Sequence, residues 1–235
     1  MPEDSPVYAF LEKPSMIDYP GYLCGTFFTS GCNFTCGFCH NATLMGRKKK
    51  CLTWGRLREV CAKFKTEWVD AVCITGGEPT LEPDLPKLIQ FMRDFDFKVK
   101  LDSNGSRPEM LEMCLPLIDY IAMDIKSSVS AYPQLTGFSQ LEKITQSVQL
   151  IMNSGIEYEF RTTVIEPFHT DAQMGEIGEL IRGAKRYTIQ PFLPQENLPN
   201  PEMRTLRRTT PERLHVIEKI VAPYVQEVIV RGAGI

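Results

Sequence analysis

The chain lacks several features that would place it in a class of protein directly. It has no excess of basic residues: 26 Lys and Arg stand against 29 Asp and Glu, for a net charge of −3. A mildly acidic chain argues against general nucleic-acid binding, which needs a basic surface. No apolar run approaches the ~20 residues that span a membrane, and residues 1–6 lack the basic flank and apolar run of a signal peptide. We therefore expect a cytoplasmic protein that binds neither nucleic acid nor membrane.

Internal repeats, low-complexity tracts and linkers are also missing from the 235 residues. This length suits one large domain, because α/β barrels often run to such a size. A domain of this kind buries about 70–75% of its unfolded surface. We expect a single domain over residues 1–235, with a core from about residue 15 to 232.

Most of the eight cysteines show no close spacing that would suggest a metal site or a second cluster: Cys24, Cys51, Cys61, Cys73 and Cys114. In a cytoplasmic chain, cysteines are thiols or metal ligands rather than disulfides. Cys73 lies in an apolar, strand-like run, and Cys61 and Cys114 lie in helix-like stretches. These, and Cys24, are expected to be buried thiols.

The remaining three cysteines lie close together within residues 30–41. Cys32, Cys36 and Cys39 have the spacing Cys-x3-Cys-x2-Cys, and Gly31 and Gly37 allow the loop to curl through positive φ. Thiolates gathered in this way favour zinc, copper(I) or an iron–sulfur cluster. A [4Fe–4S] cluster has four irons, each of which takes a thiolate. Three cysteines would therefore leave one iron open to another ligand.

Two other interpretations of these cysteines stay open. A zinc ion could take the three thiolates and His40, although structural zinc sites usually draw their ligands as two separated pairs. His40 also directly follows Cys39, which makes tetrahedral closure awkward. A disulfide scaffold would require export, of which the sequence shows no sign.

Predicted strands and helices alternate along the chain, with Thr53 as the cap of the first helix. We expect strands at residues 22–29, 71–75, 98–101, 120–125, 158–165, 187–191 and 227–230, and helices at 54–65, 85–94, 108–115, 141–153, 171–181 and 211–221. This alternation predicts right-handed crossovers and a parallel sheet with outer helices. Six to seven βα units fall short of the eight of a closed barrel. The predicted fold class is α/β, a partial (β/α)6 barrel. The basic stretch at residues 46–50 is expected to be a solvated loop.

Polar or glycine-rich segments recur at the carboxyl ends of the predicted strands: the cysteine loop, Gly76-Gly77-Glu78-Pro79, Asp102-Ser103-Asn104-Gly105 and Met123-Asp124-Ile125-Lys126. Arg161 lies within a further predicted strand. Chemistry in α/β barrels collects at this edge of the sheet. Each group alone could be ordinary turn chemistry or a surface charge. Together they predict one site on one rim.

These motifs resemble those of the radical S-adenosylmethionine (SAM) superfamily, through the cysteine loop and Gly-Gly-Glu-Pro. The likeness extends to the glycyl-radical activating enzymes, most of all the anaerobic ribonucleoside-triphosphate reductase activating proteins, and runs from about residue 10 to 232. Four segments show this likeness to the activating enzymes: Ile17-Asp18-Tyr19-Pro20-Gly21, Gly31-Cys32-Asn33-Phe34, Cys39-His40-Asn41 and Asp102-Ser103-Asn104-Gly105. Pro191-Phe192-Leu193 stands where formate-lyase activases have Pro-Tyr-His.

The resemblance implies a [4Fe–4S] cluster on Cys32, Cys36 and Cys39, with SAM on the open iron. An electron from a flavodoxin or ferredoxin would drive reductive cleavage of SAM to a 5′-deoxyadenosyl radical. That radical would take hydrogen from a backbone glycine of a glycyl radical enzyme, by likeness an anaerobic ribonucleotide reductase. No catalytic residue is implied beyond the cluster and SAM.

The resemblance also implies a SAM site near the cluster. Gly76 and Gly77 would let the backbone approach the methionyl part closely. Glu78 would assist its ammonium group or merely brace the loop. His40 and Asn41 would reach the ribose or the cluster edge, with a plain backbone contact as the alternative for each.

A monovalent cation is implied as well, held by Asp102, Ser103 and Asp124, since oxygen ligands suit a hard cation. Lys126 would pair with the SAM carboxylate or ribose, and Arg161 is a further candidate for that carboxylate. For Asp102 the alternative is an Asx-type turn.

Two other functions stay open. One is a radical SAM enzyme that acts on a small molecule or a peptide, and the other is a non-enzymatic iron–sulfur electron-transfer protein. The partner, the reductant and the oligomeric state are not specified by the sequence.

Overall fold

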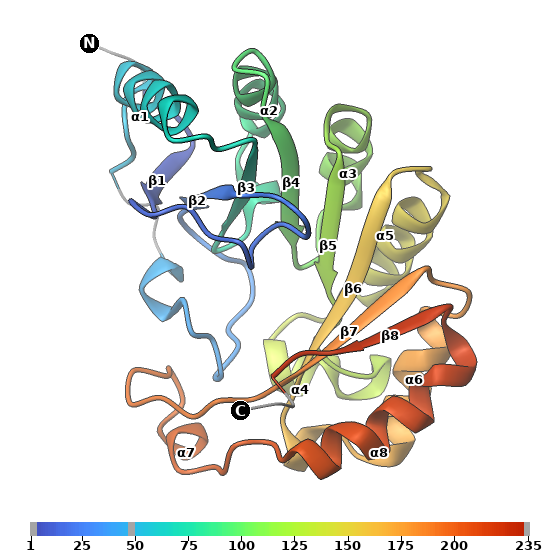
Figure 1. Ribbon diagram of the computed structural model, residues 1–235. Coiled ribbons are helices and arrows are strands. Elements are labelled where there is room, and N and C mark those ends of the chain that lie inside the picture. Colours follow the sequence, from blue (N-terminus) through green and yellow to red (C-terminus); the bar gives the residue numbers. More distant parts are fainter. Residues whose placement is uncertain (1–3, 47–49, 233–235) are drawn as a thin grey trace.

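The computed structural model describes residues 4–46 and 50–232. Eight strands form one sheet in the order β1 to β8, and the longer helices lie along the outside of this curved sheet (Figure 1). Residues 47–49, most of the basic stretch expected to be a solvated loop, lie outside the described residues. In the part of the chain that is described, no helix is long and apolar enough to cross a membrane.

Strands β2 to β8 are parallel, and β1 pairs antiparallel with β2. The strands are β1 (Val7–Phe10), β2 (Cys24–Thr29), β3 (Ala71–Gly76), β4 (Lys98–Ser103), β5 (Tyr120–Asp124), β6 (Glu157–Val164), β7 (Arg186–Pro191) and β8 (Glu227–Val230). The helices are α1 (Trp54–Thr66), α2 (Leu85–Arg93), α3 (Pro108–Cys114), α4 (Tyr132–Thr136), α5 (Leu141–Asn153), α6 (Asp171–Leu180), α7 (Pro201–Arg204) and α8 (Pro211–Val221).

The predicted parallel α/β sheet is confirmed, and every predicted strand lies within two residues of an observed one. Thr53 caps α1 as predicted, because its hydroxyl accepts a hydrogen bond from Arg56 N at 3.2 Å. The sequence analysis did not predict the short elements β1, α4 and α7. Since β1 and β8 are the two ends of the strand order, the described sheet is open rather than closed.

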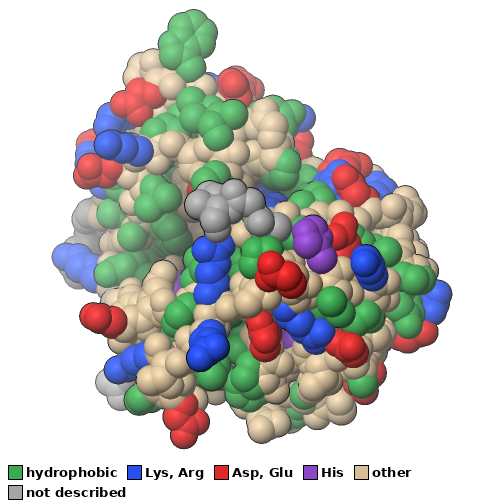
Figure 2. All heavy atoms as spheres, turned by 60° about the horizontal axis from the view of Figure 1, so that its bottom comes forward, with side chains coloured by type: hydrophobic (Ala, Val, Ile, Leu, Met, Phe, Trp, Pro, Cys, Tyr) green, Lys and Arg blue, Asp and Glu red, His purple; other side chains and the backbone are tan. Residues whose placement is uncertain are grey.

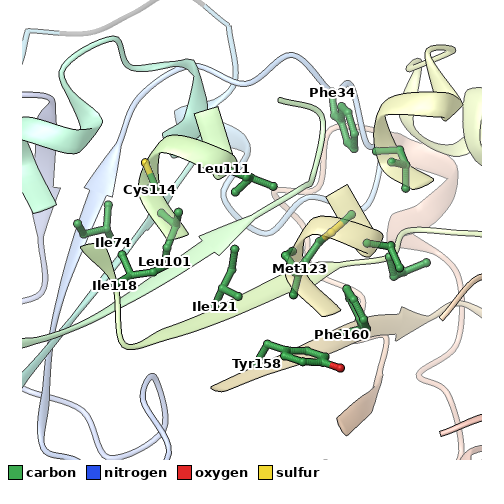
Figure 3. Packing of buried hydrophobic residues seen from close by; sticks show 14 of the residues in the cluster. Phe34, Ile74, Leu101, Leu111, Cys114, Ile118, Ile121, Met123, Tyr158 and Phe160 are labelled. Carbon is green, nitrogen blue, oxygen red and sulfur yellow. The ribbon is translucent and has the colours of Figure 1, made fainter. Parts of the chain in front are cut away.

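The two faces of the sheet differ in chemistry, because successive residues of a strand point to opposite sides. On the outer face, side chains such as Ile74, Leu101 and Phe160 join the large apolar core under the helices (Figure 3). The inner face carries polar and charged side chains, among them Lys100 and Asp102 of β4. The hollow of the sheet is therefore lined by charged side chains beside a small apolar cluster that includes Cys73, Tyr120 and Ala122.

The four cysteines that were predicted to be buried thiols are buried. Cys24, Cys61, Cys73 and Cys114 are at most 1% exposed. Burial raises the pKa of Cys61 and of Cys114 to about 12, so at neutral pH both behave as small apolar side chains.

Phe64 of α1 fastens this helix to the first two strands. Its ring is fully buried and lies 5.7 Å from the ring of Phe27 and 6.2 Å from that of Phe10. We expect Phe64→Ala to lower the free energy of unfolding by about 3–5 kcal/mol, because it leaves a cavity. The matched control is Met113→Ala on α3, where the side chain is 58% exposed and the expected change is within about 0.5 kcal/mol. Equal losses in urea titrations would contradict this account of the packing.

Candidate cofactor-binding site

The carboxyl ends of the parallel strands surround a cavity of about 330 Å³. Pockets for small molecules and cofactors commonly measure about 300–1,000 Å³. The lining contains every residue that the sequence analysis singled out for a site: Cys32, Cys36, Cys39, His40, Asn41, Gly76, Gly77, Glu78, Asp102, Ser103, Asp124, Lys126 and Arg161. The structure thus brings together residues that lie as far as 129 positions apart, whereas the roles assigned to them stay predictions.

The cysteine loop follows β2 and is held by distant segments. Gly31 N donates to Leu44 O at 2.8 Å, Thr35 N donates to Thr136 O at 2.7 Å, and Gly37 O accepts from Asn200 N at 3.1 Å. Three separate parts of the chain therefore fix the path of the loop.

The thiols of this loop are protonated at neutral pH in the metal-free protein. Burial raises the pKa of Cys32 to about 11 and that of Cys36 to about 12, and it also raises the pKa of Cys39. A metal binds the thiolate, so binding here must displace a proton from each cysteine.

The donor set fits an iron–sulfur cluster better than zinc. His40, the fourth ligand that zinc would need, places Nε2 at 2.9 Å from Leu193 O and stacks on Phe192. Among the described residues, no three His, Cys, Asp or Glu side chains are arranged to hold a single metal ion. A [4Fe–4S] cluster binds each thiolate to a different iron. Three thiols around one cavity suit that arrangement, in which Cys32, Cys36 and Cys39 would be the ligands.

Gly76 and Gly77 allow the end of β3 to lie directly against the cysteine loop. Gly77 N donates to Thr29 O at 3.1 Å, and Glu78 N donates to Gly31 O at 2.8 Å. A Cβ atom on Gly77 would lie 2.0 Å from Gly31 O, and one on Gly76 would lie 2.3 Å from Thr29 O. Such distances exclude any side chain, so both glycines are required by this contact between backbones.

Glu78 braces the loops around the cavity. Its side chain is buried and accepts hydrogen bonds from Thr80 N at 3.1 Å, Ser103 Oγ at 2.8 Å and Asn104 N at 2.6 Å. Burial raises the pKa of Glu78 even though these donors favour the carboxylate. Of the two roles considered for Glu78, the geometry supports the brace.

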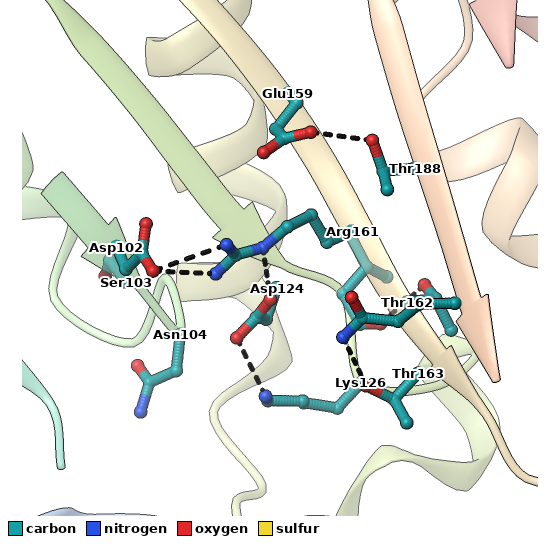
Figure 4. Close-up of polar contacts among 12 residues, drawn as sticks. Asp102, Ser103, Asn104, Asp124, Lys126, Glu159, Arg161, Thr162, Thr163 and Thr188 are labelled. Carbon is teal, nitrogen blue, oxygen red and sulfur yellow. Dashed lines mark hydrogen bonds and ion pairs between the residues drawn. The ribbon is translucent and has the colours of Figure 1, made fainter. Parts of the chain in front are cut away.

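Five charged residues form an alternating series across the inner face of the sheet, Lys100–Asp102–Arg161–Asp124–Lys126, which we call the charge chain. Figure 4 shows its part from Asp102 to Lys126. Arg161 lies between the two aspartates, with Nε 2.9 Å from Asp124 Oδ1 and Nη2 3.2 Å from Asp102 Oδ2. Lys100 Nζ lies 2.5 Å from Asp102 Oδ1, and Lys126 Nζ lies 2.9 Å from Asp124 Oδ2. Every carboxylate oxygen of the pair therefore has a cationic partner.

The charge chain keeps both aspartates ionised. Burial by itself disfavours the carboxylates, but the neighbouring Arg161 guanidinium and the lysines hold the pKa of each below its usual range. The same contacts raise the pKa of Lys100, Lys126 and Arg161 against the effect of burial.

The third predicted cation ligand, Ser103, has other partners. Its Oγ donates to Glu78 and accepts from Gly105 N at 3.0 Å. The Asx-type turn considered for Asp102 is formed instead by Asn104, whose Oδ1 accepts from Ser106 N at 2.9 Å.

The sequence analysis missed an amide link between the cysteine loop and the end of β4. Asn104 Nδ2 donates to Asn33 Oδ1 at 3.1 Å, and Asn33 Nδ2 donates to Ser106 Oγ at 2.8 Å. Asn104 Nδ2 also lies 3.9 Å from Cys32 Sγ. Both asparagines stand in the motifs quoted above, but nothing in the sequence indicated that they pair.

His169 and Lys100 were missed as well. His169 is buried, and its Nε2 lies 3.0 Å from Lys126 O, so it supports the backbone that presents Lys126. Lys100 falls in a predicted strand, and the signal was its position two residues before Asp102, which puts both on one face.

Comparison with known proteins defines the class. Residues 26–181 match the radical SAM superfamily, and the chain belongs to this superfamily. It is therefore an enzyme of the radical SAM type, a superfamily associated with a [4Fe–4S] cluster and SAM.

Two relatives are similar to the chain over different lengths. A protein of Methanocaldococcus jannaschii that is provisionally named a glycyl-radical enzyme activating enzyme is 29% identical over 225 residues, which cover 92% of each chain. A 7-carboxy-7-deazaguanine synthase of Bacillus subtilis is 30% identical over 125 residues, or 52% of this chain and 49% of that one.

Solved structures support the fold. Streptococcus suis SuiB bound to S-adenosylmethionine has a TM-score of 0.67 at 15% identity, covering 86% of this chain and 48% of that chain. A domain of a pyruvate-formate lyase-activating enzyme from Bacteroides vulgatus has a TM-score of 0.56 at 16% identity, covering 69% and 99%. The predicted radical SAM type of partial barrel is confirmed.

We expect Asp102→Asn to destabilise the protein by about 3–5 kcal/mol at pH 7, because it leaves Lys100 buried without its carboxylate. The folded pKa of Asp102 is lowered, so its contribution is complete above about pH 4 and is lost as the pH falls through the folded pKa. The difference between wild type and variant should therefore shrink in urea titrations below about pH 4.

The matched control is Glu157→Gln, which removes an exposed ion pair with Lys185 and should change stability by at most about 1 kcal/mol. A difference for Asp102→Asn that stays constant between pH 7 and pH 3 would show that the charge of Asp102 does not stabilise the fold.

Proposed function

We propose that the protein is an activating enzyme that cleaves SAM reductively and generates a glycyl radical on a partner enzyme, an anaerobic ribonucleotide reductase. One observation carries the proposal: Cys32, Cys36 and Cys39 share a single cavity with the polar ends of β3 to β6. The M. jannaschii relative, matched over 92% of both chains, supports the activating role.

In this proposal the three thiolates hold a [4Fe–4S] cluster, and Gly76 and Gly77 present backbone to the methionyl part of SAM. When bound, the cluster supplies the electron for cleavage of SAM, and SAM supplies the radical that removes hydrogen. Glu78 N holds this segment against the cysteine loop by donating to Gly31 O, and the Glu78 carboxylate binds the end of β4 through Ser103 and Asn104.

Other side chains of the cavity orient the cofactor and shield it from water. His40 and Asn41 line the cavity directly after Cys39. Lys126 lines the cavity, 5.8 Å from the Phe38 ring centre, and is held by Asp124. In this proposal its ammonium group would pair with the SAM carboxylate or ribose. An electron donor of the flavodoxin or ferredoxin type completes the proposed reaction.

The open sheet suits a protein substrate in this proposal, because a sheet that does not close into a barrel leaves the cavity less enclosed. The face seen in Figure 2 carries Lys and Arg interspersed with Asp and Glu, so charge of neither sign dominates it. Recognition on this face would then depend on shape and local pairing rather than on one strong field.

A second candidate function is a radical SAM reaction on a small molecule or peptide. The observation that favours it is the 30% identity with a 7-carboxy-7-deazaguanine synthase over about half of the chain. A third, electron transfer without catalysis, would require a cluster that does not cleave SAM.

The test uses anaerobically reconstituted protein with SAM and a reductant, with and without the anaerobic ribonucleotide reductase of the same organism. We expect methionine and 5′-deoxyadenosine, and a doublet glycyl radical signal in electron paramagnetic resonance when the reductase is present. Cys36→Ala should abolish both, whereas Cys114→Ala, a buried thiol outside the cavity lining, should retain them.

The outcomes separate the candidates. Cleavage of SAM without a radical on the reductase would favour a small-molecule or peptide substrate. Bound iron without any cleavage of SAM would favour electron transfer. Full iron content and activity in Cys36→Ala would refute the assignment of the cluster ligands.

A further inference from the structure

Lys100 is placed unusually for a lysine. It belongs to β4, its side chain is only 2% exposed, and its Nζ lies 2.5 Å from Asp102 Oδ1 and 3.8 Å from Cys73 Sγ. Lysine is almost never fully buried unless it is paired. An apolar side chain would fill the same space without desolvation of a charge, so the ammonium group at this position calls for a specific explanation.

Within the charge chain itself, no carboxylate oxygen is left without a cationic partner. Two carboxylates of this chain face three cations. Glu159, the next carboxylate on the inner face, accepts from Thr188 Oγ1 at 2.6 Å and pairs with Arg231 at 3.1 Å. Asp18 also lines the cavity, where it accepts from Thr26 Oγ1 at 2.9 Å. A metal ion added between Asp102 and Asp124 would meet the charge chain, which by itself is net positive.

The predicted cation ligands therefore do not fit a free ion. Asp102 and Asp124 would have to exchange Arg161, Lys100 or Lys126 for it, and Ser103 would have to leave Glu78. The desolvated carboxylates already hold charge-assisted hydrogen bonds, which are the strong class of such contacts.

We propose that Lys100, together with Arg161, takes the place of the monovalent cation, so that this protein orders its SAM site with a tethered ammonium group and needs neither free potassium nor sodium. This inference rests on the proposed function, since it concerns the same cavity. Lys100 is a positioning residue: it lies behind Asp102, outside the cavity lining, and acts by holding the carboxylate that in turn holds Arg161.

Lys126 differs from Lys100 in a way that separates their roles. Its side chain is 21% exposed and lines the cavity, so it can turn toward a ligand. Lys100 has no such access and can serve only to balance and orient charge. Replacement of Lys100 by an uncharged side chain should therefore open a cation site without removing a contact to SAM.

The test compares Lys100→Met with the matched control Lys98→Met. Lys98 lies on the same strand, is exposed and pairs with Asp119 at 3.0 Å, so its loss leaves the cavity unchanged. Melting temperatures are measured on the reconstituted full chain with SAM and without reductant, in potassium, sodium or choline chloride at equal ionic strength. Equilibrium binding of SAM in the same salts is the second readout.

We expect the melting temperatures of wild type and Lys98→Met to be the same in all three salts. Lys100→Met should gain a saturable stabilisation by potassium or sodium but not by choline, of about 5–10 °C at a concentration about 100 times the dissociation constant. Its affinity for SAM should fall in choline and recover with the small cation. Addition of Asp102→Asn to Lys100→Met should abolish the gain, because the carboxylate is then missing.

Two results would overturn the inference. Saturable stabilisation of the wild type by potassium or sodium would show that a free ion binds in the natural chain. A folded Lys100→Met, or Lys100→Gln if the first variant does not fold, that shows no ion-specific effect would show that Lys100 does not replace a cation. Neither measurement requires SAM cleavage or a partner protein, so a failure of the proposed function would be seen separately.

Discussion

The contact between two stretches of backbone, at Gly77 and Gly31, is the constraint from which the rest of the site follows. It leaves no room for a side chain, and it places the end of β3 against the cysteine loop. Glu78 N then bonds Gly31 O, and the Glu78 carboxylate holds the end of β4 through Ser103 and Asn104. Asn104 Nδ2 in turn donates to Asn33 Oδ1, which returns this series of contacts to the cysteine loop. Cysteine loop, β3 and β4 thus fix one another.

Backbone contacts hold the side of the cavity formed by the cysteine loop and β3. Ion pairs hold the other side, at the ends of β4, β5 and β6. Asp102, Asp124, Lys126 and Arg161 line this side of the cavity, and the ion pairs of the charge chain satisfy one another. Isolated ion pairs of this kind add little net stability, but loss of one member is costly because a buried charge is left alone. The arrangement therefore favours a single geometry at the ends of β4, β5 and β6, which is what the ordering of a cofactor requires.

The sequence was sufficient for the fold and for the expectation that the predicted site residues lie on one rim, but it did not indicate other lining residues such as Asp18, Thr163 and Gln190. Alternating strands and helices predicted the parallel sheet, and in such a sheet the carboxyl ends of all strands meet at one edge, so Asp102, Asp124 and Gly76 had to lie together. The sequence did not predict which side chains form hydrogen bonds or ion pairs with one another. Strand periodicity tells which face Lys100 occupies but not which atom it meets, and the bond from Asn104 to Asn33 joins residues 71 positions apart. The four-residue β1 carried too short a pattern to predict.

The central claim is that three cysteines leave one iron of a cluster open for SAM. The most direct measurement is the electron paramagnetic resonance spectrum of the anaerobically reduced protein, recorded before and after addition of SAM. The account predicts a changed spectrum, because the amino and carboxylate groups of SAM become ligands of the open iron. A spectrum that stays the same at saturating SAM would contradict it.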